Sequence, residues 1–143
     1  MTHAVPNLTE HVSVRDFKDI PLSAEIKAQL SLAARSASSS HFVQSFSIIE
    51  ITDMTLRSQL ANITESAPYV KQTGAFYVFV ADLYRQSTLL TKQGKSLDGL
   101  SNMESLLVSI VDTTIAPKIW LLPLKQWSWV SAISVVFVMM SKK

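Results

Sequence analysis

The stretch Ala75-Phe76-Tyr77-Val78-Phe79-Val80-Ala81 decides the fold class, because every residue in it is apolar and most are aromatic or β-branched. Such a run favours a strand in the middle of a sheet, buried on both faces. Patterns typical of helices and shorter strands occur on either side of it. The chain is therefore predicted to form an α/β or α+β domain in which helices pack on a sheet.

A helix is predicted before this strand, starting at Pro21-Leu22-Ser23 and running to about Arg35. The Ser23 side chain can accept a hydrogen bond from a free backbone N–H group in the first turn. Ile26, Leu30 and Ala33 follow at spacings of four and three residues, which places them on one apolar face of the helix.

A second strand and a second helix are predicted from the next residues. The run Ser47-Ile48-Ile49-Glu50-Ile51 predicts the strand. Asp53 can cap the helix that follows, and Leu56, Leu60 and Ile63 are expected on one apolar side of it.

A long helix is predicted from residue 100 onwards, because apolar residues recur there with a helical period. This face contains Met103, Leu107, Ile110 and Thr114, with Leu106 and Val111 beside it. The helix is therefore expected to be buried. Pro117 is expected to interrupt it, since a proline removes a backbone hydrogen bond and clashes with the preceding turn.

Composition and charge restrict the function. The 143 residues suffice for one domain with a core, and 48% of them are hydrophobic. The net charge is +2 with scattered basic residues, which argues against a nucleic-acid partner. The absence of cysteine excludes disulfides and thiolate sites. Residues 1–10 do not have the pattern of a secretory signal, so a cytoplasmic location is predicted.

Two further kinds of site are not expected. Neither the histidines nor the glycines have the spacing that a metal site or a glycine-rich phosphate loop requires. These residues are His3, His11, His41, Gly74, Gly94 and Gly99.

The segment His11-Val12-Ser13-Val14-Arg15 is the first candidate for a binding site. Alternate side chains of an extended segment share one face, so His11, Ser13 and Arg15 are expected on one side. Together they can hold an anionic oxygen, and the guanidinium can bind a phosphate through two parallel hydrogen bonds. The alternative is an edge strand with a solvated polar face.

Residues 36–44, here named the serine loop, are the second candidate. Their sequence is Ser36-Ala37-Ser38-Ser39-Ser40-His41-Phe42-Val43-Gln44. A short loop between a helix and a strand can present hydroxyl and backbone N–H groups to a ligand. The alternative is a flexible connection.

The C-terminal tail has two interpretations. Residues 119–140 are largely apolar and contain all three tryptophans of the chain. An apolar stretch with aromatic residues at its flanks is typical of a membrane anchor. Pro123, Lys125 and Gln126 lie inside this stretch, however, and the uninterrupted part is shorter than the ~20 residues that a span requires. A buried or aggregation-prone strand is the other interpretation.

Several short motifs occur in a fixed order between residues 8 and 116. They are His11-Val12-Ser13-Val14-Arg15, Ser38-Ser39-Ser40 with Phe42 and Gln44, Ser47-Ile48-Ile49, Ile51-Thr52-Asp53, Tyr69-Val70, Phe79-Val80-Ala81-Asp82, Leu106-Leu107, Val111-Asp112-Thr113 and Ala116. No single motif is specific. The ordered set resembles the N-terminal half of the FMN-dependent NADPH nitroreductase and flavin reductase family, of the oxygen-insensitive major nitroreductase type.

The resemblance implies a homodimeric α+β flavoprotein with a mixed sheet flanked by helices, of which this chain would form an incomplete part. FMN is the implied cofactor, and part of the serine loop would approach it, often from the partner subunit. His11, Ser13 and Arg15 would hold its phosphate and ribityl chain. The remaining implied cofactor-binding residues are Ser38, Ser39, Ser40, Phe42, Gln44 and Tyr69.

The implied activity is reduction of FMN by NADPH, followed by electron transfer to a nitroaromatic compound, a quinone or a free flavin. No side-chain acid, base or metal is implied in this chemistry, which the cofactor carries. Asp82 and Arg85, which follow the central strand, are predicted to be structural.

Two residues depart from the family pattern. The family usually has arginine in place of Val12 and a flavin-contacting glutamine in place of Ala67. Weak or absent FMN binding and little activity are therefore expected of this chain alone.

The tail departs further, because after Ala116 the Ala-Gln-Asn, Gly-Leu-Gly and Tyr-Ile-Gly-Gly motifs of the family are missing. Codons compatible with residues 116–141, read one base out of register, can encode such motifs at three places. Residues 1–116 are therefore predicted to be half of a nitroreductase-like domain, and residues 117–143 an aberrant, frameshifted tail.

Two other functions stay open. The chain could be a small tail-anchored membrane protein, with residues 127–140 as the anchor. It could also be a non-catalytic partner that pairs with an intact paralogue through the serine-loop surface.

Overall fold

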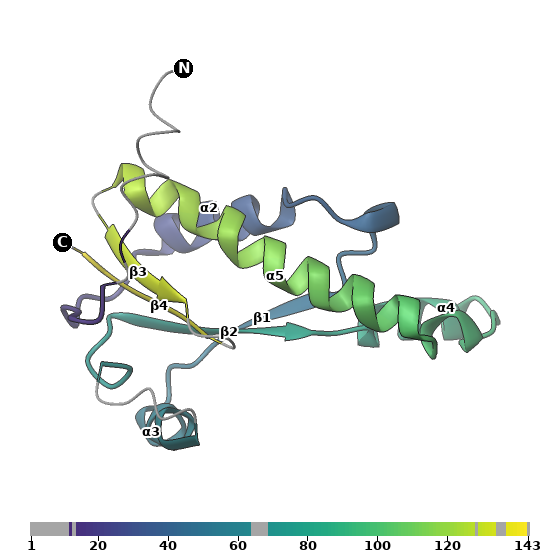
Figure 1. The fold of residues 1–143 in the computed structure, drawn as a ribbon, viewed down its shortest axis with the longest axis horizontal. Helices are drawn as coiled ribbons and strands as arrows, with labels where there is room; N and C mark the ends of the chain where they lie inside the picture. The colour runs from purple at the N-terminus through teal and green to yellow at the C-terminus, as the bar shows by residue number, and fades with distance from the viewer. Residues whose placement is uncertain (1–11, 13, 64–68, 128, 134–136, 143) are drawn as a thin grey trace.

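A computed structural model describes residues 12, 14–63, 69–127, 129–133 and 137–142. Figure 1 shows a sheet with one long helix lying along it. The strands are β1 (Phe46–Glu50), β2 (Ala75–Ala81), β3 (Trp129–Ile133) and β4 (Phe137–Lys142). The helices are α2 (Ala24–Arg35), α3 (Met54–Ile63), α4 (Tyr84–Lys92) and α5 (Met103–Gln126), with short 3₁₀ turns η1 (Ser40–Phe42) and η2 (Asp98–Leu100).

The strands form one sheet in the order β1-β2-β4-β3. Ile48 lies opposite Phe79, and Tyr77 lies opposite Val138. The α+β class is confirmed, but every strand pair among the described residues is antiparallel, where a mixed sheet was expected. The chain leaves and re-enters the same end of the sheet through α3, so β1 and β2 need no crossover across a face (Figure 1).

The central strand is confirmed with its predicted bounds. Tyr77 and Phe79 face α5, where Trp120 lies edge-on to both rings at centroid distances of 4.7 and 5.4 Å. Phe76 faces the opposite side and packs in a second apolar cluster with Phe17. The strand is therefore buried on both faces, as its uniform apolar sequence predicts.

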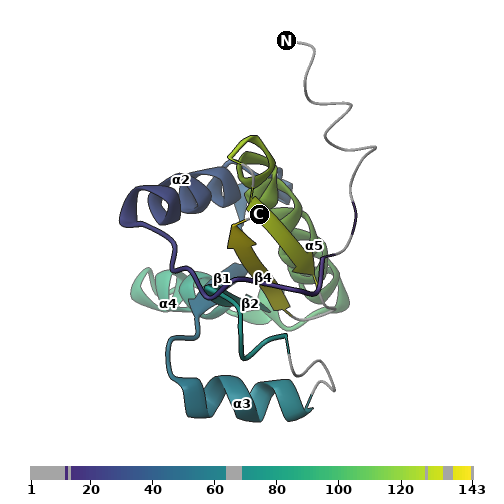
Figure 2. The ribbon, with the colours of Figure 1, turned by 90° about the vertical axis from the view of Figure 1, so that its left-hand side faces the viewer.

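Helices cover both faces of the sheet. Figure 2 shows α2 and α5 on one side and α3 on the other. The N-cap predicted at Ser23 is confirmed, since its Oγ accepts a hydrogen bond from the Ile26 N–H at 3.4 Å. Leu30 and Ala34 are fully buried in the cluster that includes α5.

Of the apolar side predicted for α3, only Leu60 packs against the core, where it is partly buried beside the Phe76 cluster, and the predicted cap is confirmed. Asp53 Oδ1 accepts a hydrogen bond from the Leu56 N–H at 2.7 Å. Leu56 and Ile63 are nevertheless exposed, and the buried residues of α3 are Arg57 and Ala61. The helix is turned so that the guanidinium of Arg57 donates to the backbone carbonyls of Thr73 and Ile51.

The prediction that the long helix is buried is wrong for its first half. There α5 runs past the end of the sheet (Figure 1). Five apolar side chains of this half are 48% to 67% exposed, namely Met103, Leu106, Leu107, Ile110 and Val111. We name these five residues the α5 apolar face.

Pro117 does not interrupt α5, which continues to Gln126 through Pro117 and Pro123. A proline inside a helix costs about 3 kcal/mol. Trp120 and Leu124 after it are 2% and 0% exposed, and burial of each large apolar side chain contributes about 1.5–3 kcal/mol. Packing therefore outweighs the lost backbone hydrogen bond.

The described part of the tail is helical up to Gln126, within α5, and forms strands from Trp129 on, which agrees in part with the second of its two interpretations. Trp129 of β3 is buried in the cluster under α5, and β4 pairs with β2. Among the described residues one helical stretch, Met103–Leu124, is long and apolar enough to cross a membrane, with a mean hydropathy of 1.4. It lies within α5 and overlaps the predicted anchor, residues 119–140, only at residues 119–124.

Candidate functional site

The serine loop lies over the middle of α5 and is held there by Asp112. This side chain is 2% exposed. Its Oδ2 accepts hydrogen bonds from the Ser39 hydroxyl at 2.8 Å and from both the N–H and the hydroxyl of Ser45 at 3.0 Å. A buried carboxylate with three donors fixes both ends of the loop's central turn.

A second set of contacts holds the loop from α4. Arg85 Nη2 donates to the carbonyl of Gln44 at 2.6 Å, and Gln86 Nε2 donates to the carbonyl of Val43 at 2.5 Å. The Gln44 side chain in turn donates to the Arg35 carbonyl at the end of α2 at 2.7 Å. The loop is thus an anchored element, which excludes the flexible-connection alternative.

The backbone of the loop is strained. His41, Phe42 and Gln44 have φ values of 50°, 57° and 49°, in the left-handed region that L-residues avoid. Each such residue costs about 1–3 kcal/mol and persists only where surrounding contacts over-determine it. The result is that Ser40 and His41 are exposed and the Phe42 ring is 76% exposed.

Hollows flank the loop on α5. One of about 430 Å³ is lined by Ser38, Ser39 and Ser40 on one side and by α5 residues including Leu107 and Val111 on the other. A second, of about 440 Å³, lies between the loop, α4, η2 and the start of α5. Both combine hydroxyl groups with an apolar wall, as a site for a flat organic ring requires.

The other predicted residues lie elsewhere. His11 and Ser13 are outside the described residues. Residues 14–20, here named the arginine segment, form no strand, and Arg15 is exposed with no side-chain hydrogen bond or ion pair in the described part of the chain. Tyr69 is half-buried, and its ring centroid lies 6.5 Å from that of Phe17 in the same segment.

The arginine segment is pressed against the start of β2. A Cβ atom at Gly74 would lie 1.9 Å from the Ile20 carbonyl oxygen, so only glycine permits this contact. Phe17 is 7% exposed in the cluster on the α3 side of the sheet. Arg15, two residues before it, is therefore presented from a fixed surface.

The structure separates the predicted residues into two groups at opposite ends of the sheet. The serine loop enters β1 at Phe46, opposite Ala81 at the last residue of β2, whereas Gly74 precedes the first residue of β2. Seven strand residues span about 23 Å. Figure 1 shows the same separation along the long axis of the molecule. One copy of the chain therefore does not bring Arg15 and the serine loop together.

Asp82 and Arg85 have the structural role predicted for them. Asp82 accepts hydrogen bonds from the Ser47 hydroxyl and, at 2.8 Å, from the Tyr84 N–H. These bonds lower the pKa of Asp82, the Ser47 bond most. Asp112 and Gln86 are site residues that the sequence did not single out as such. The signal for Asp112 was a lone carboxylate within the apolar pattern of a helix.

The comparison with protein families agrees with this fold. The model of the nitroreductase family matches residues 8–141. The chain belongs to the nitroreductase family. Among curated relatives, an FMN reductase (NADPH) of Bacillus subtilis (strain 168) is 36% identical over 117 residues, which cover 81% of this chain and 47% of that protein. An NADPH-dependent oxidoreductase of Staphylococcus aureus (strain USA300) is 38% identical over 119 residues, with 80% and 46% covered.

The chain spans about half the length of the curated relatives it matches. Solved nitroreductase structures resemble it over nearly its whole length. NfrA1 nitroreductase from B. subtilis has a TM-score of 0.91 at 25% identity, covering 98% of this chain and 66% of that one. NADPH:FMN oxidoreductase from Vibrio harveyi, complexed with NAD⁺, has a TM-score of 0.86 at 23% identity, covering 97% and 68%, and shows the fold alone.

Proposed function

We propose that this chain carries FMN-binding elements of an NAD(P)H-dependent oxidoreductase that reduces nitroaromatic compounds, quinones or flavins. Membership of the nitroreductase family supports it. The names of the relatives support FMN and NADPH as its partners. When bound, FMN supplies a relay for hydride between the nicotinamide and the acceptor.

The strained serine loop is the observation that carries the proposal. Asp112, Arg85 and Gln86 hold three left-handed residues in place, and strain of this kind clusters at ligand sites. The loop presents exposed hydroxyls at Ser38 and Ser40 and an exposed ring at Phe42. Hydroxyl donors beside an aromatic ring fit the polar edge and the flat face of a flavin.

The exposed guanidinium of Arg15 fits the phosphate of FMN, because arginine binds phosphate through two parallel hydrogen bonds. His11 and Ser13, at alternate positions before it, are proposed to bind the phosphate and ribityl chain. Tyr69 would lie beside them, since its ring packs on Phe17.

The two groups fit one FMN molecule only if they come from two copies of the chain. A homodimer is therefore part of the proposal, with Arg15 from one copy and the serine loop from its partner. The α5 apolar face, next to the serine loop, supports such an assembly, because large exposed apolar patches mark protein interfaces.

Titration of the purified protein with FMN tests the proposal. Quenching of flavin fluorescence should saturate with a weak Kd, because Val12 leaves one positive charge fewer near the phosphate than the family usually has. Arg15→Ala should weaken this binding further, while Lys95→Ala, which removes an exposed cation outside the proposed site, should not. No quenching at any FMN concentration contradicts the proposed function, and a purified protein that retains stoichiometric FMN contradicts the expectation of weak binding.

A non-catalytic partner of a full-length relative is the second candidate, and the α5 apolar face favours it, since such a surface also fits the matching face of a relative. The test is to mix the chain with an equimolar full-length nitroreductase and resolve the species by size. A mixed dimer that forms at the expense of the full-length homodimer supports this role, and an unchanged homodimer contradicts it.

We also propose a cytoplasmic location. Fractionation followed by carbonate extraction of membranes separates it from the tail-anchored alternative, because an integral protein stays in the pellet. Recovery in the pellet would contradict both the location and the flavoprotein proposal.

The frameshifted origin of residues 117–143 remains a proposal as well. The curated alignments cover 81% and 80% of this chain and leave about a fifth of it unmatched, which supports the proposal. The match to the family model runs on to residue 141, so the nucleotide sequence is the decisive test. A one-base shift near codon 117 should open the family motifs, and an undisturbed frame shared with relatives that end in the same tail would contradict the idea.

A further inference from the structure

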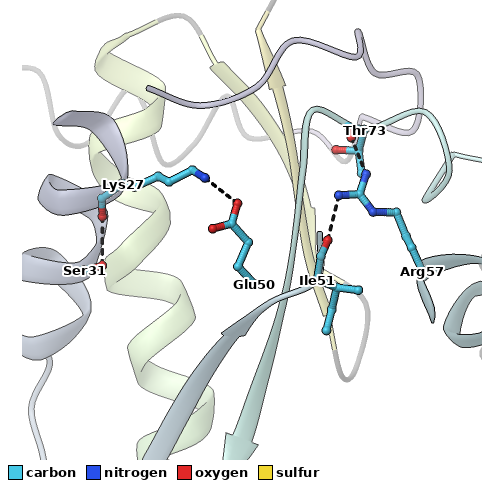
Figure 3. A network of polar contacts seen from close by, with 6 residues as sticks. All are labelled: Lys27, Ser31, Glu50, Ile51, Arg57 and Thr73. Atoms are coloured by element: carbon cyan, nitrogen blue, oxygen red, sulfur yellow. Dashed lines mark hydrogen bonds and ion pairs between the residues drawn. The ribbon is translucent and has the colours of Figure 1, made fainter. Parts of the chain in front are cut away.

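Arg57 is a buried cation that forms no ion pair within the described part of the chain. Its side chain is 7% exposed. Nη1 donates to the carbonyl of Thr73 at 2.8 Å, and Nη2 donates to the carbonyl of Ile51 at 2.9 Å. Figure 3 shows the guanidinium reaching from α3 to both carbonyls. Its central carbon also lies 6.0 Å from the centre of the Phe76 ring.

Burial of the Arg57 charge costs free energy, which an apolar side chain at this position of α3 would avoid. Burial lowers the pKa of Arg57, and its Nε is a buried donor without a partner among the described residues. A leucine would fill the same space without desolvating a charge. What only the guanidinium offers is a planar fork that reaches two carbonyls on separate segments at once. Arg57 thereby ties the end of β1 to the residues that precede β2.

The arginine segment rests on this tied surface. The Ile20 carbonyl lies against Gly74, the residue after Thr73, with no room for a Cβ atom between them. Phe17 packs in the same apolar cluster as Phe76, over which the guanidinium lies. The carboxylate of Asp19 attracts the charge of Arg57. Two contacts and one electrostatic attraction therefore connect the segment to Arg57 or to the residues around it.

We propose that Arg57 is a positioning residue for the phosphate end of the FMN site. By holding Ile51 and Thr73 it fixes the surface under the arginine segment, and so sets where Arg15 presents its guanidinium. The inference rests on the proposed function, and Arg57 itself acts through Arg15 and not on the ligand.

A comparison of FMN with riboflavin, which lacks the phosphate, separates positioning from a general loss of structure. Arg57→Met keeps the apolar stem and removes the donors. It should raise the Kd for FMN about tenfold and leave the Kd for riboflavin within about twofold. Arg57→Lys keeps the charge but not the planar fork of donors. Its Kd for FMN should lie between those of the wild type and of Arg57→Met. Equal weakening of FMN and riboflavin binding would overturn the proposal.

The Arg15→Ala background tests the route through Arg15. If Arg57 acts by placing Arg15, then Arg57→Met should have no further effect on FMN affinity once Arg15 is absent. Full additivity of the two substitutions would overturn the proposal.

A cofactor-independent measurement keeps the inference separate from the proposed function. Endoproteinase Asp-N cuts before Asp16 and Asp19 in the arginine segment, and before the exposed Asp98 in η2 as an internal reference. Arg57→Met should raise the cutting rate in the segment relative to Asp98 about fivefold or more, because a detached segment opens more often. Lys27→Met is the control, since it removes the 2.7 Å ion pair with Glu50 at the same end of the sheet and should leave the ratio unchanged.

The outcomes are distinguishable. If the wild-type protein binds neither flavin, the proposed function fails and the cutting ratio alone decides whether Arg57 positions the segment. If Arg57→Met does not fold, Asp19→Asn replaces it, with a smaller rise at Asp16 expected from the lost attraction. An unchanged ratio in the variant that folds overturns the inference.

Discussion

The two ends of the sheet are each held by one buried charge, and the charges have opposite signs. At the serine-loop end, the carboxylate of Asp112 accepts hydrogen bonds from Ser39 and Ser45. At the other end, the guanidinium of Arg57 donates to Ile51 and Thr73. Both charges bind groups at points where the chain leaves regular structure.

The sign of each charge matches the groups that it binds. The loop before β1 turns hydroxyl and N–H donors inward, which require an acceptor. The residues next to β1 and β2 at the opposite end turn carbonyls inward, which require donors. A buried polar group without a partner is costly. A carboxylate therefore lies where donors point inward, and a guanidinium lies where carbonyls point inward.

Removal of the carboxylate should have the largest effect. Asp112→Ala leaves three donors without their acceptor and should lower the free energy of unfolding by about 3 kcal/mol. Asp112→Asn keeps one acceptor oxygen and should cost about 1 kcal/mol. Urea unfolding measures both. A smaller loss for alanine than for asparagine would show that the carboxylate does not hold the loop.

Gly74→Ala should have the next largest effect, at the opposite end. Its Cβ would lie 1.9 Å from the Ile20 oxygen, so the arginine segment must move away, at a cost of about 2 kcal/mol. Gly99→Ala is the matched control, because nothing lies within 4 Å of a Cβ there. Thermal unfolding should separate the two variants, and FMN affinity should fall only in the first. Equal melting temperatures would mean that the segment is not pressed against β2.

Local signals in the sequence predicted the elements, but not which of their faces is buried. The strand at residues 75–81 and the caps at Ser23 and Asp53 were predicted correctly, since each depends on neighbouring residues. The buried face of α3 and the exposed first half of α5 were not. Those faces depend on where each helix meets the sheet, and periodicity contains no information about that.

The same limit explains the site. The serine loop was found from its composition, yet Asp112, which holds it, is 73 residues from Ser39 in sequence. Arg57 was not singled out because an arginine within a helix is normally solvated. The resemblance implied a serine loop that often comes from the partner subunit, and the fold adds the reason, since the two groups of predicted residues lie at opposite ends of the sheet.

Alkaline pH should lower the free energy of unfolding through Tyr77, near the end of the sheet where Arg57 lies. Burial, with Glu50 nearby, raises the pKa of Tyr77 above its ordinary value. The folded protein therefore keeps this proton where the unfolded chain loses it, so stability should fall as pH rises above about 10. Tyr77→Phe should remove that part of the decline, as urea unfolding at several pH values would show. An identical pH profile for the variant would contradict the assignment.

The smallest effect is expected from relief of backbone strain in the serine loop. The described non-glycine residues with positive φ all lie in this loop, at one end of the sheet. Phe42 has a φ of 57° and a ring that is 76% exposed, so little packing holds it in this conformation. Phe42→Gly should raise the free energy of unfolding by about 0.5 kcal/mol relative to Phe42→Ala, because both variants lose the ring and only glycine accepts the positive φ freely. Both should bind FMN more weakly than wild type, since the ring is proposed to lie against the flavin. If Phe42→Gly is the more stable variant and neither Phe42→Gly nor Phe42→Ala changes FMN affinity, the strained backbone does not serve to place Phe42 against a ligand.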